Sequence, residues 1–279
     1  VRRLLMPYVS KSAPGLVSAQ RMLIQGPPNS GKTHSVCATW PRPLHIVVAP
    51  GEVGDATIPR GVEGIYPYIW EEQQTGIKTS SQDTLAQVET LMWEIIGGKY
   101  GPVESLCFDG FHKHYGYILD WISGGALFKG EALGSSEDPY ASARMYNRAR
   151  EYARYFVQRV NRSLIPNVVW ICWDGREADD PTKGFKSQSH VFPGLPGQAA
   201  KEFMGEFSLT VHARILWAQR QPKGLAPAKW QLLPEGDVWG AVVKAPAAVI
   251  AELPVYCDQS YKVLKQVLET AYAKAQAKP

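Results

Sequence analysis

The run from Gly26 to Thr33 constrains the fold of this chain more than any other feature of its sequence. It reads Gly-Pro-Pro-Asn-Ser-Gly-Lys-Thr and satisfies the phosphate-loop pattern G-x-x-x-x-G-K-[ST] in full. Such a loop lies between a buried strand and a helix, because its backbone N–H groups and the positive end of the helix dipole must face phosphate oxygens. The apolar run 21–25 precedes it and a helical pattern over 32–39 follows it, so the sequence predicts a strand, a phosphate loop and a helix in succession.

The residue types within the loop indicate what it binds. Glycines allow the tight backbone turn, the Lys32 ammonium is expected to reach the β- and γ-phosphates, and the Thr33 hydroxyl is expected to ligate Mg²⁺. The predicted ligand is therefore a nucleoside triphosphate with Mg²⁺. The predicted contact residues are those of the loop and the position after it: Gly26, Pro27, Pro28, Asn29, Ser30, Gly31, Lys32, Thr33 and His34.

Besides the loop's hydroxyl, a phosphate-loop site needs a carboxylate from elsewhere in the chain for the Mg²⁺ water shell. We expect this carboxylate at the end of a buried strand beside the loop's own strand. Asp109 follows the strand expected at 103–108 and is the candidate for this metal-binding position. The alternative is a turn residue before Gly110. Because Gly110, and not a glutamate, follows Asp109, the acid that polarises the attacking water must come from elsewhere.

Two other acids follow predicted strands and are candidates for catalytic roles. Glu52 comes after the second strand, at the same expected edge of the sheet, and Asp174 ends the fourth, where a polar group can sense the γ-phosphate. Each fits a solvated loop acid equally well. The predicted catalytic set is Lys32, Glu52, Asp109 and Asp174.

The order of elements predicts an α/β fold. Buried strands alternate with helices, which indicates a mainly parallel sheet covered on both faces. The strands are expected at 21–25, 44–49, 103–108 and 168–172, with a short one within 65–70, and the helices at 81–96, 111–123, 140–164 and 261–277. Runs 207–217 and 229–233 predict antiparallel additions joined by a hairpin-like connection. We expect one domain over 1–279, with an N-terminal extension at 1–20 and a C-terminal helix within 255–279.

Composition narrows the class of protein. The chain has 279 residues, of which 45% are hydrophobic and 20% charged, as in an ordinary globular protein. Its net charge of +4 permits a polyanionic partner without demanding one. The four cysteines show no C-x-x-C spacing, and Cys107 and Cys172 lie in apolar runs, which indicates a reducing compartment with no disulfide framework and no zinc site. No apolar run approaches the ~20 residues of a membrane span, so we expect a cytoplasmic protein without a membrane partner.

Four segments together resemble a known family, the phage-encoded RecA-like nucleotide-binding ATPases, which are AAA-domain proteins that include single-strand-annealing recombinases. The resemblance covers most of the chain. It rests on residues 24–33, 106–109 and 167–174, and on 193–203 leading into 207–213. It implies ATP as the nucleotide, a RecA-type core, a ring or filament of identical subunits, single-stranded DNA as partner and, for a phage protein, the host bacterial cytoplasm.

The resemblance also implies that a cation from a neighbouring subunit completes the ATP site. Lys244 lies where the family tends to carry a late lysine, although an ordinary surface lysine would fit as well. Two departures affect the hydrolytic residues. Glu52 follows Pro50-Gly51 instead of preceding it, and the fourth strand ends in Cys-Trp-Asp-Gly instead of a Thr/Ser-Ala-His-Glu type of run.

Two loops and one helix face are candidates for binding nucleic acid, because basic residues with interleaved aromatics suit single strands. The first loop, 124–139, carries Lys129, and the second, 175–192, carries Arg176, Lys183, Phe185 and Lys186. The long helix places four arginines within about 60° of one another at 100° per residue. These are Arg144, Arg148, Arg159 and Arg162. The alternatives are solvated loops and, for the helix face, contact with a neighbouring subunit or a solvated surface.

Three functions fit these features. The leading hypothesis is an ATP-binding and ATP-hydrolysing recombination protein that anneals or exchanges single-stranded DNA. The second is a DNA-packaging motor ATPase, although the chain lacks the length and the acidic cluster of a nuclease domain. The third is a nucleotide-dependent assembly factor for which hydrolysis is not essential.

Overall fold

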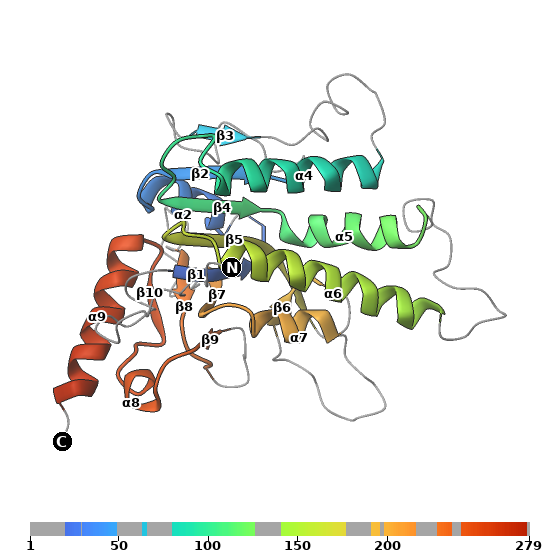
Figure 1. Cartoon of the computed structure of the whole chain (residues 1–279). Helices are drawn as coiled ribbons and strands as arrows, with labels where there is room; N and C mark the ends of the chain where they lie inside the picture. Colours follow the sequence, from blue (N-terminus) through green and yellow to red (C-terminus); the bar gives the residue numbers. More distant parts are fainter. Residues whose placement is uncertain are drawn as a thin grey trace, which may run out of the picture.

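The structure, a computed structural model, describes residues 20–28, 30–48, 63–65, 80–125, 141–176, 191–195, 198–215, 228–235 and 241–277. These residues form a mixed sheet with helices on both faces (Figure 1). No helix in these ranges is both long and apolar enough to cross a membrane.

The centre of the sheet is parallel. Its strands lie in the order β7-β1-β5-β4-β2-β3, with bounds Leu209–Ile215, Gln20–Gly26, Asn167–Arg176, Ser105–Asp109, Pro43–Val47 and Glu63–Ile65. Antiparallel strands extend it: β8 and then β10 continue beyond β7, while β9 pairs with β7 and β6 with β5. Their bounds are Ala228–Gln231, Tyr256–Asp258, Val242–Val243 and Val191–Pro193. The predicted fold class, an α/β phosphate-loop core with antiparallel strands added near the C-terminus, is confirmed. The run 207–217 is an exception to the expected antiparallel additions, because its strand β7 pairs parallel with β1 and antiparallel only with β8 and β9.

Each face of the sheet carries its own hydrophobic core. One core lies between the sheet and four helices, α4, α5, α6 and α7, of which α4, α5 and α6 run side by side in Figure 1. Their bounds are Ser81–Ile96, Phe111–Ile122, Ala141–Asn161 and Gln198–Met204. The other core lies beneath α2, α8 and α9, which span Lys32–Thr39, Ala247–Ile250 and Tyr261–Ala277. Burying apolar side chains on both faces is what a central parallel sheet requires.

Helix α4 is capped by Ser80, whose hydroxyl accepts a hydrogen bond from the Asp83 N–H, while the next residue, Ser81, is buried and donates to Asp120 Oδ2 at 2.6 Å. One expectation is corrected: the strand that ends at Asp109 does not lie beside β1, because β5 separates β4 from β1. Apolar patterning identifies buried strands without specifying which of them are neighbours.

Candidate nucleotide-binding site

The phosphate loop connects β1 to α2, as the sequence predicts. Gly31 is the N-cap of α2 with φ 78°, in the left-handed region that favours glycine, and a Cβ there would lie 2.9 Å from Gln259 Oε1. A Cβ on Gly26 would lie 2.7 Å from the Ala213 carbonyl oxygen on β7. Both glycines therefore permit close packing around the loop. Gln259 also donates from Nε2 to the Ser30 carbonyl oxygen at 3.0 Å, so the segment before α9 contacts the loop directly.

The side chain of Lys32 folds back onto its own loop. Its Nζ donates to the carbonyl oxygens of Gly26 at 2.8 Å and Pro27 at 2.7 Å. The side chain is buried, so these carbonyls satisfy an ammonium group that has little contact with water. In this structure the Lys32 ammonium is therefore held by the carbonyls of its own loop.

Asp109 meets the loop although its strand is not adjacent to β1. The Thr33 hydroxyl donates to Asp109 Oδ2 at 2.5 Å, and His45 Nε2 lies 3.2 Å from the same oxygen. Thr33 comes from α2, Asp109 from the carboxyl end of β4 and His45 from β2 beside it. The side chains of Asp109 and His45 are almost fully buried, so Asp109 is held from two sides inside the protein.

Electrostatics favours charge on this buried cluster. Burial alone would lower the pKa of His45, but hydrogen bonds with Asp109 and Cys37 outweigh that effect and raise the pKa to about 9. Hydrogen bonding from Cys107 is the largest cause that lowers the pKa of the Cys37 thiol to about 5, with His45 contributing. We therefore treat His45 as an imidazolium that donates to the Asp109 carboxylate at neutral pH. All four cysteines fall within the described residues, where each is buried and none forms a disulfide.

A second histidine–aspartate contact joins the two strands that flank the phosphate-loop strand. Asp174 lies on β5 and His212 on β7, the two strands that flank β1, and His212 Nε2 is 3.3 Å from Asp174 Oδ2. Burial would raise the pKa of Asp174, but the hydrogen bond from His212 and the charges of His212 and Lys32 lower it. Asp174 is thus ionised at neutral pH. In the pairing of β1 with β5, Gly26 lies opposite Trp173, so Asp174 is one residue beyond the start of the phosphate loop.

Trp173 forms a small aromatic cluster at the same edge of the sheet. Its ring stacks on His112, with centroids 4.6 Å apart, and the ammonium of Lys113 lies 5.6 Å from the ring centroid. The Trp173 N–H approaches His112 Nδ1 at 3.4 Å. Burial lowers the pKa of His112 to about 4, so this imidazole is neutral and suited to stacking.

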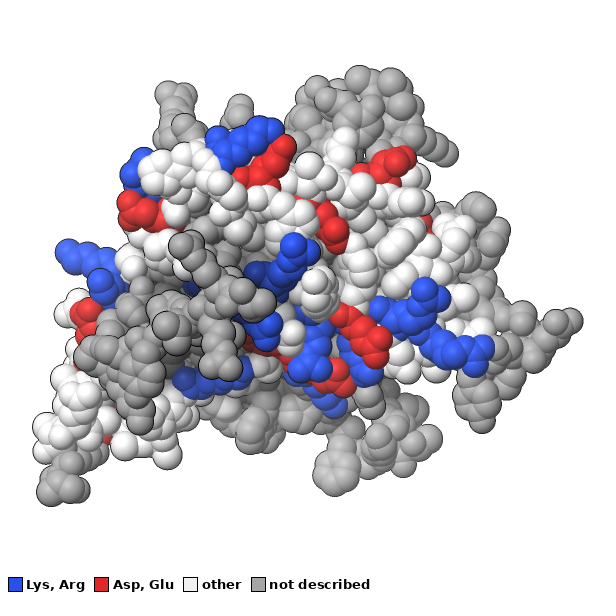
Figure 2. Space-filling model, viewed as in Figure 1, with Lys and Arg blue, Asp and Glu red and all other residues white. Residues whose placement is uncertain are grey.

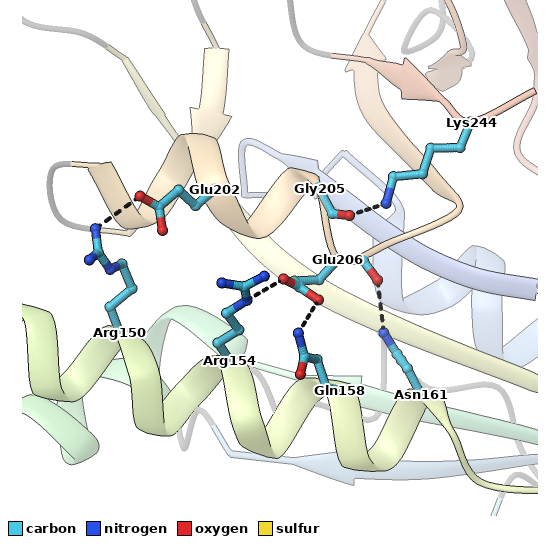
Figure 3. Close-up of polar contacts among 8 residues, drawn as sticks. All are labelled: Arg150, Arg154, Gln158, Asn161, Glu202, Gly205, Glu206 and Lys244. Carbon is cyan, nitrogen blue, oxygen red and sulfur yellow. Dashed lines mark hydrogen bonds and ion pairs between the residues drawn. The ribbon is translucent and has the colours of Figure 1, made fainter.

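The other predicted residues fall in three groups. Pro27, Pro28, Ser30 and His34 lie in or beside the loop, with His34 exposed on α2, and Arg176 ends β5. Lys244 lies at the amino end of β7, whereas the phosphate loop follows the carboxyl end of parallel β1; its ammonium donates to the Gly205 carbonyl (Figure 3). Some predictions lie outside the described residues: Asn29, Glu52, Lys129, Lys183, Phe185 and Lys186.

His45 and His212 are the candidates that sequence reasoning missed. Each is a polar residue inside an apolar strand, at 43–47 and 209–215, and each contacts an acid that was predicted. A histidine in a buried strand needs a partner. That requirement, applied to strands expected near the loop, would have identified both.

The donor set beside the loop fits Mg²⁺. A hydroxyl and a carboxylate lie 2.5 Å apart at the N-terminus of α2, and hard oxygen ligands are what Mg²⁺ takes in phosphate sites. Thr33 and Asp109 are the residues that would hold the ion. Within the described ranges, no group of three or more His, Cys, Asp and Glu side chains could bind a metal by itself, and Mg²⁺ sites of this type rely on substrate phosphates.

Comparisons with known proteins add little to this geometry. The sequence matches no protein-family model and no curated protein. Among solved structures, a KaiC-like protein, PH0186 from Pyrococcus horikoshii OT3, aligns over 81% of this chain and 89% of its own, with a TM-score of 0.31 and 10% identity. A likeness at this level carries no functional argument, so the assignment rests on the loop and its contacts.

Proposed function

We propose that this protein is a Mg²⁺-dependent P-loop ATPase that acts on single-stranded DNA in annealing or strand exchange. The observation that carries the nucleotide part is the contact of Thr33 with Asp109, 2.5 Å across two elements that are 76 residues apart in sequence. Lys32 and the backbone N–H groups at the start of α2 lie at the same place. This is the arrangement that holds the phosphates and metal of a nucleoside triphosphate.

Each residue of the site has a separate role in binding Mg²⁺–ATP. Lys32 leaves the carbonyls of Gly26 and Pro27 and binds the β- and γ-phosphates, while Thr33 and Asp109 hold Mg²⁺. When bound, the ion neutralises charge on the β- and γ-phosphates. His45 donates to the Asp109 carboxylate and fixes its orientation, so it acts as a positioning residue.

Asp174 is our candidate for orienting the attacking water. A carboxylate repels the γ-phosphate, so Asp174 is better suited to accept a hydrogen bond from water than to bind phosphate. His212 holds one of its oxygens through Nε2. Glu52 remains a predicted alternative for the same role.

The DNA partner, the oligomer and the role of Lys244 remain proposals supported by the family resemblance. The location of Lys244 away from its own loop is compatible with action on a neighbouring subunit. Its contact with Gly205 would have to break for that role.

The test has two parts. Phosphate release from ATP is measured with and without single-stranded DNA, and binding of labelled single-stranded DNA is measured with and without ATP and Mg²⁺. We expect turnover that Lys32→Ala abolishes and DNA binding that nucleotide modulates. An absence of DNA binding at low salt under every condition would remove the DNA part, and an active Lys32→Ala variant would remove the nucleotide part.

A further inference from the structure

Helix α6 carries an unusual amount of positive charge. It contains five arginines and a single acidic residue, Glu151, and Arg162 follows its last residue. Its apolar face packs into the core through Ala149, Ala153, Phe156, Val157 and Val160. The remaining faces must therefore accommodate the charge.

One side of the helix neutralises its arginines within the protein (Figure 3). Arg150 Nη1 lies 2.9 Å from Glu202 Oε1, and Arg154 Nε lies 2.6 Å from Glu206 Oε1. Gln158 donates to the other oxygen of Glu206 at 2.9 Å. These contacts join α6 to α7 and account for two of the arginines.

The outer side carries the other three arginines of α6. Together with Tyr155 and with Arg162 they form what we call the α6 stripe: Arg144, Arg148, Tyr155, Arg159 and Arg162, all exposed. In Figure 2, basic side chains gather over the region of α6 with acidic ones between them. From Arg144 to Arg162 the stripe extends about 27 Å at 1.5 Å per residue. Counting Glu151, its net charge is +3, from four arginines and one glutamate.

Two aromatic contacts distinguish the stripe from a solvated basic surface. The Arg159 guanidinium lies 3.9 Å from the centroid of the Trp93 ring, which holds it in place on the surface. Tyr155 is 63% exposed in the middle of the stripe, and the Arg159 guanidinium lies 6.0 Å from the centroid of its ring. An exposed aromatic among arginines suits an unpaired base beside its phosphates, whereas bases in a duplex are already stacked on one another.

We infer that the α6 stripe binds single-stranded nucleic acid, with the arginines contacting phosphates and Tyr155 stacking on a base. The inference rests on the DNA part of the proposed function and specifies its surface. Helix α6 leads into β5, the strand that carries Asp174, and runs antiparallel to it from the nucleotide edge of the sheet. Binding along α6 would therefore reach the edge at which ATP binds.

The test compares Arg148→Glu/Arg162→Glu with Lys262→Glu/Lys274→Glu, which makes the same charge change at exposed positions of α9 on the opposite face of the sheet. Binding of fluorescent oligo(dT) is measured by anisotropy from about 50 to 300 mM salt. We expect the α6 variant to bind about 10- to 100-fold more weakly at low salt, with a slope of log K against log salt reduced by about 1.4, or about 0.7 per phosphate contact.

Tyr155→Ala separates stacking from charge. We expect a loss of about 5-fold or more in affinity with an unchanged salt slope, because stacking is worth about 1–3 kcal/mol per base. The α9 control is expected to remain within about 2-fold of the wild type. Thermal unfolding and unstimulated ATP turnover of each variant verify that the fold and the nucleotide site are intact.

The possible results are distinguishable. If the wild type binds oligo(dT) and the α6 variants bind equally well, or if the α9 control loses as much affinity, the inference is overturned while the proposed function stands. A preference for duplex over oligo(dT) that is insensitive to Tyr155→Ala also overturns it. If the wild type binds no nucleic acid, this inference and the DNA part of the proposed function fail together, while ATP turnover still reports on the P-loop.

Discussion

Replacing His45 with leucine tests whether the His45 side chain fixes the orientation of the Asp109 carboxylate. The His45 side chain is 0% exposed and that of Asp109 1%, so the contact between them is dry. Removing one partner of a buried charged pair costs about 3–5 kcal/mol. Because Thr33 still donates to Asp109, we expect a loss near the lower end, about 3 kcal/mol in the free energy of unfolding.

The effect on Mg²⁺–ATP should be specific. Loss of a residue that orients a metal ligand costs about 10- to 100-fold in metal affinity. We expect His45→Leu to weaken ATP binding by that factor in Mg²⁺ and to leave binding in EDTA nearly unchanged. His45→Gln keeps a donor near the position of Nε2 and should restore part of the affinity. Calorimetric titration of ATP with and without Mg²⁺, together with urea unfolding, measures both effects.

His114 provides a matched control. It is also a fully buried histidine, but among the described residues its ring nitrogens have no hydrogen-bond partner, and burial lowers its pKa to about 3. It packs against Phe108 and Phe156. We expect His114→Leu to change the free energy of unfolding by less than about 1 kcal/mol, since it removes unsatisfied polar atoms. Equal losses of Mg²⁺–ATP affinity in His45→Leu and His114→Leu would refute the role assigned to His45.

Three further predictions follow from single contacts. His212→Ala should lower kcat for ATP about 10- to 100-fold with little change in KM, because Asp174 loses its orienting donor, and His212→Gln should recover part of it; an unaltered kcat argues against this role. Arg21 donates to the carbonyl oxygens of Asn161, Ser163 and Pro166, so Arg21→Ala should lower the free energy of unfolding by about 2–4 kcal/mol. Urea unfolding measures this loss, and a loss under about 0.5 kcal/mol contradicts the prediction. Gly31→Ala should cost about 1–2 kcal/mol of strain and reduce ATP affinity in a binding titration, since it forces a Cβ into the left-handed region and toward Gln259; wild-type affinity would count against it.

The local elements of the core could be read from the sequence. Helices 32–39 and 261–277 have the predicted bounds, and strands β1, β4 and β7 differ from prediction by one to two residues at each end. These segments have strong apolar periodicity and are bounded by glycine, proline or polar residues, so local propensity and burial agree. Shorter pieces such as α8 and β9 carry too few residues for a pattern.

The contacts between distant segments could not be read in this way. The sequence identifies Asp109 and Asp174 as acids at strand ends, but the order of the sheet decides what lies beside them. That order puts β5 next to β1 and brings His212 across to Asp174, and it places His45 behind Asp109. Such pairings depend on tertiary packing, which one chain's local pattern does not encode.

The central claim is that the phosphate loop and Asp109 form one Mg²⁺–nucleotide site. The most direct test is the affinity for ATP with and without Mg²⁺, in the wild type and in Asp109→Asn, which keeps an acceptor for Thr33 but removes the charge. We predict that Mg²⁺ tightens ATP binding by about 10-fold or more in the wild type and has little effect in the variant. Wild-type Mg²⁺ dependence in Asp109→Asn, or no ATP binding by the wild type, would contradict the account.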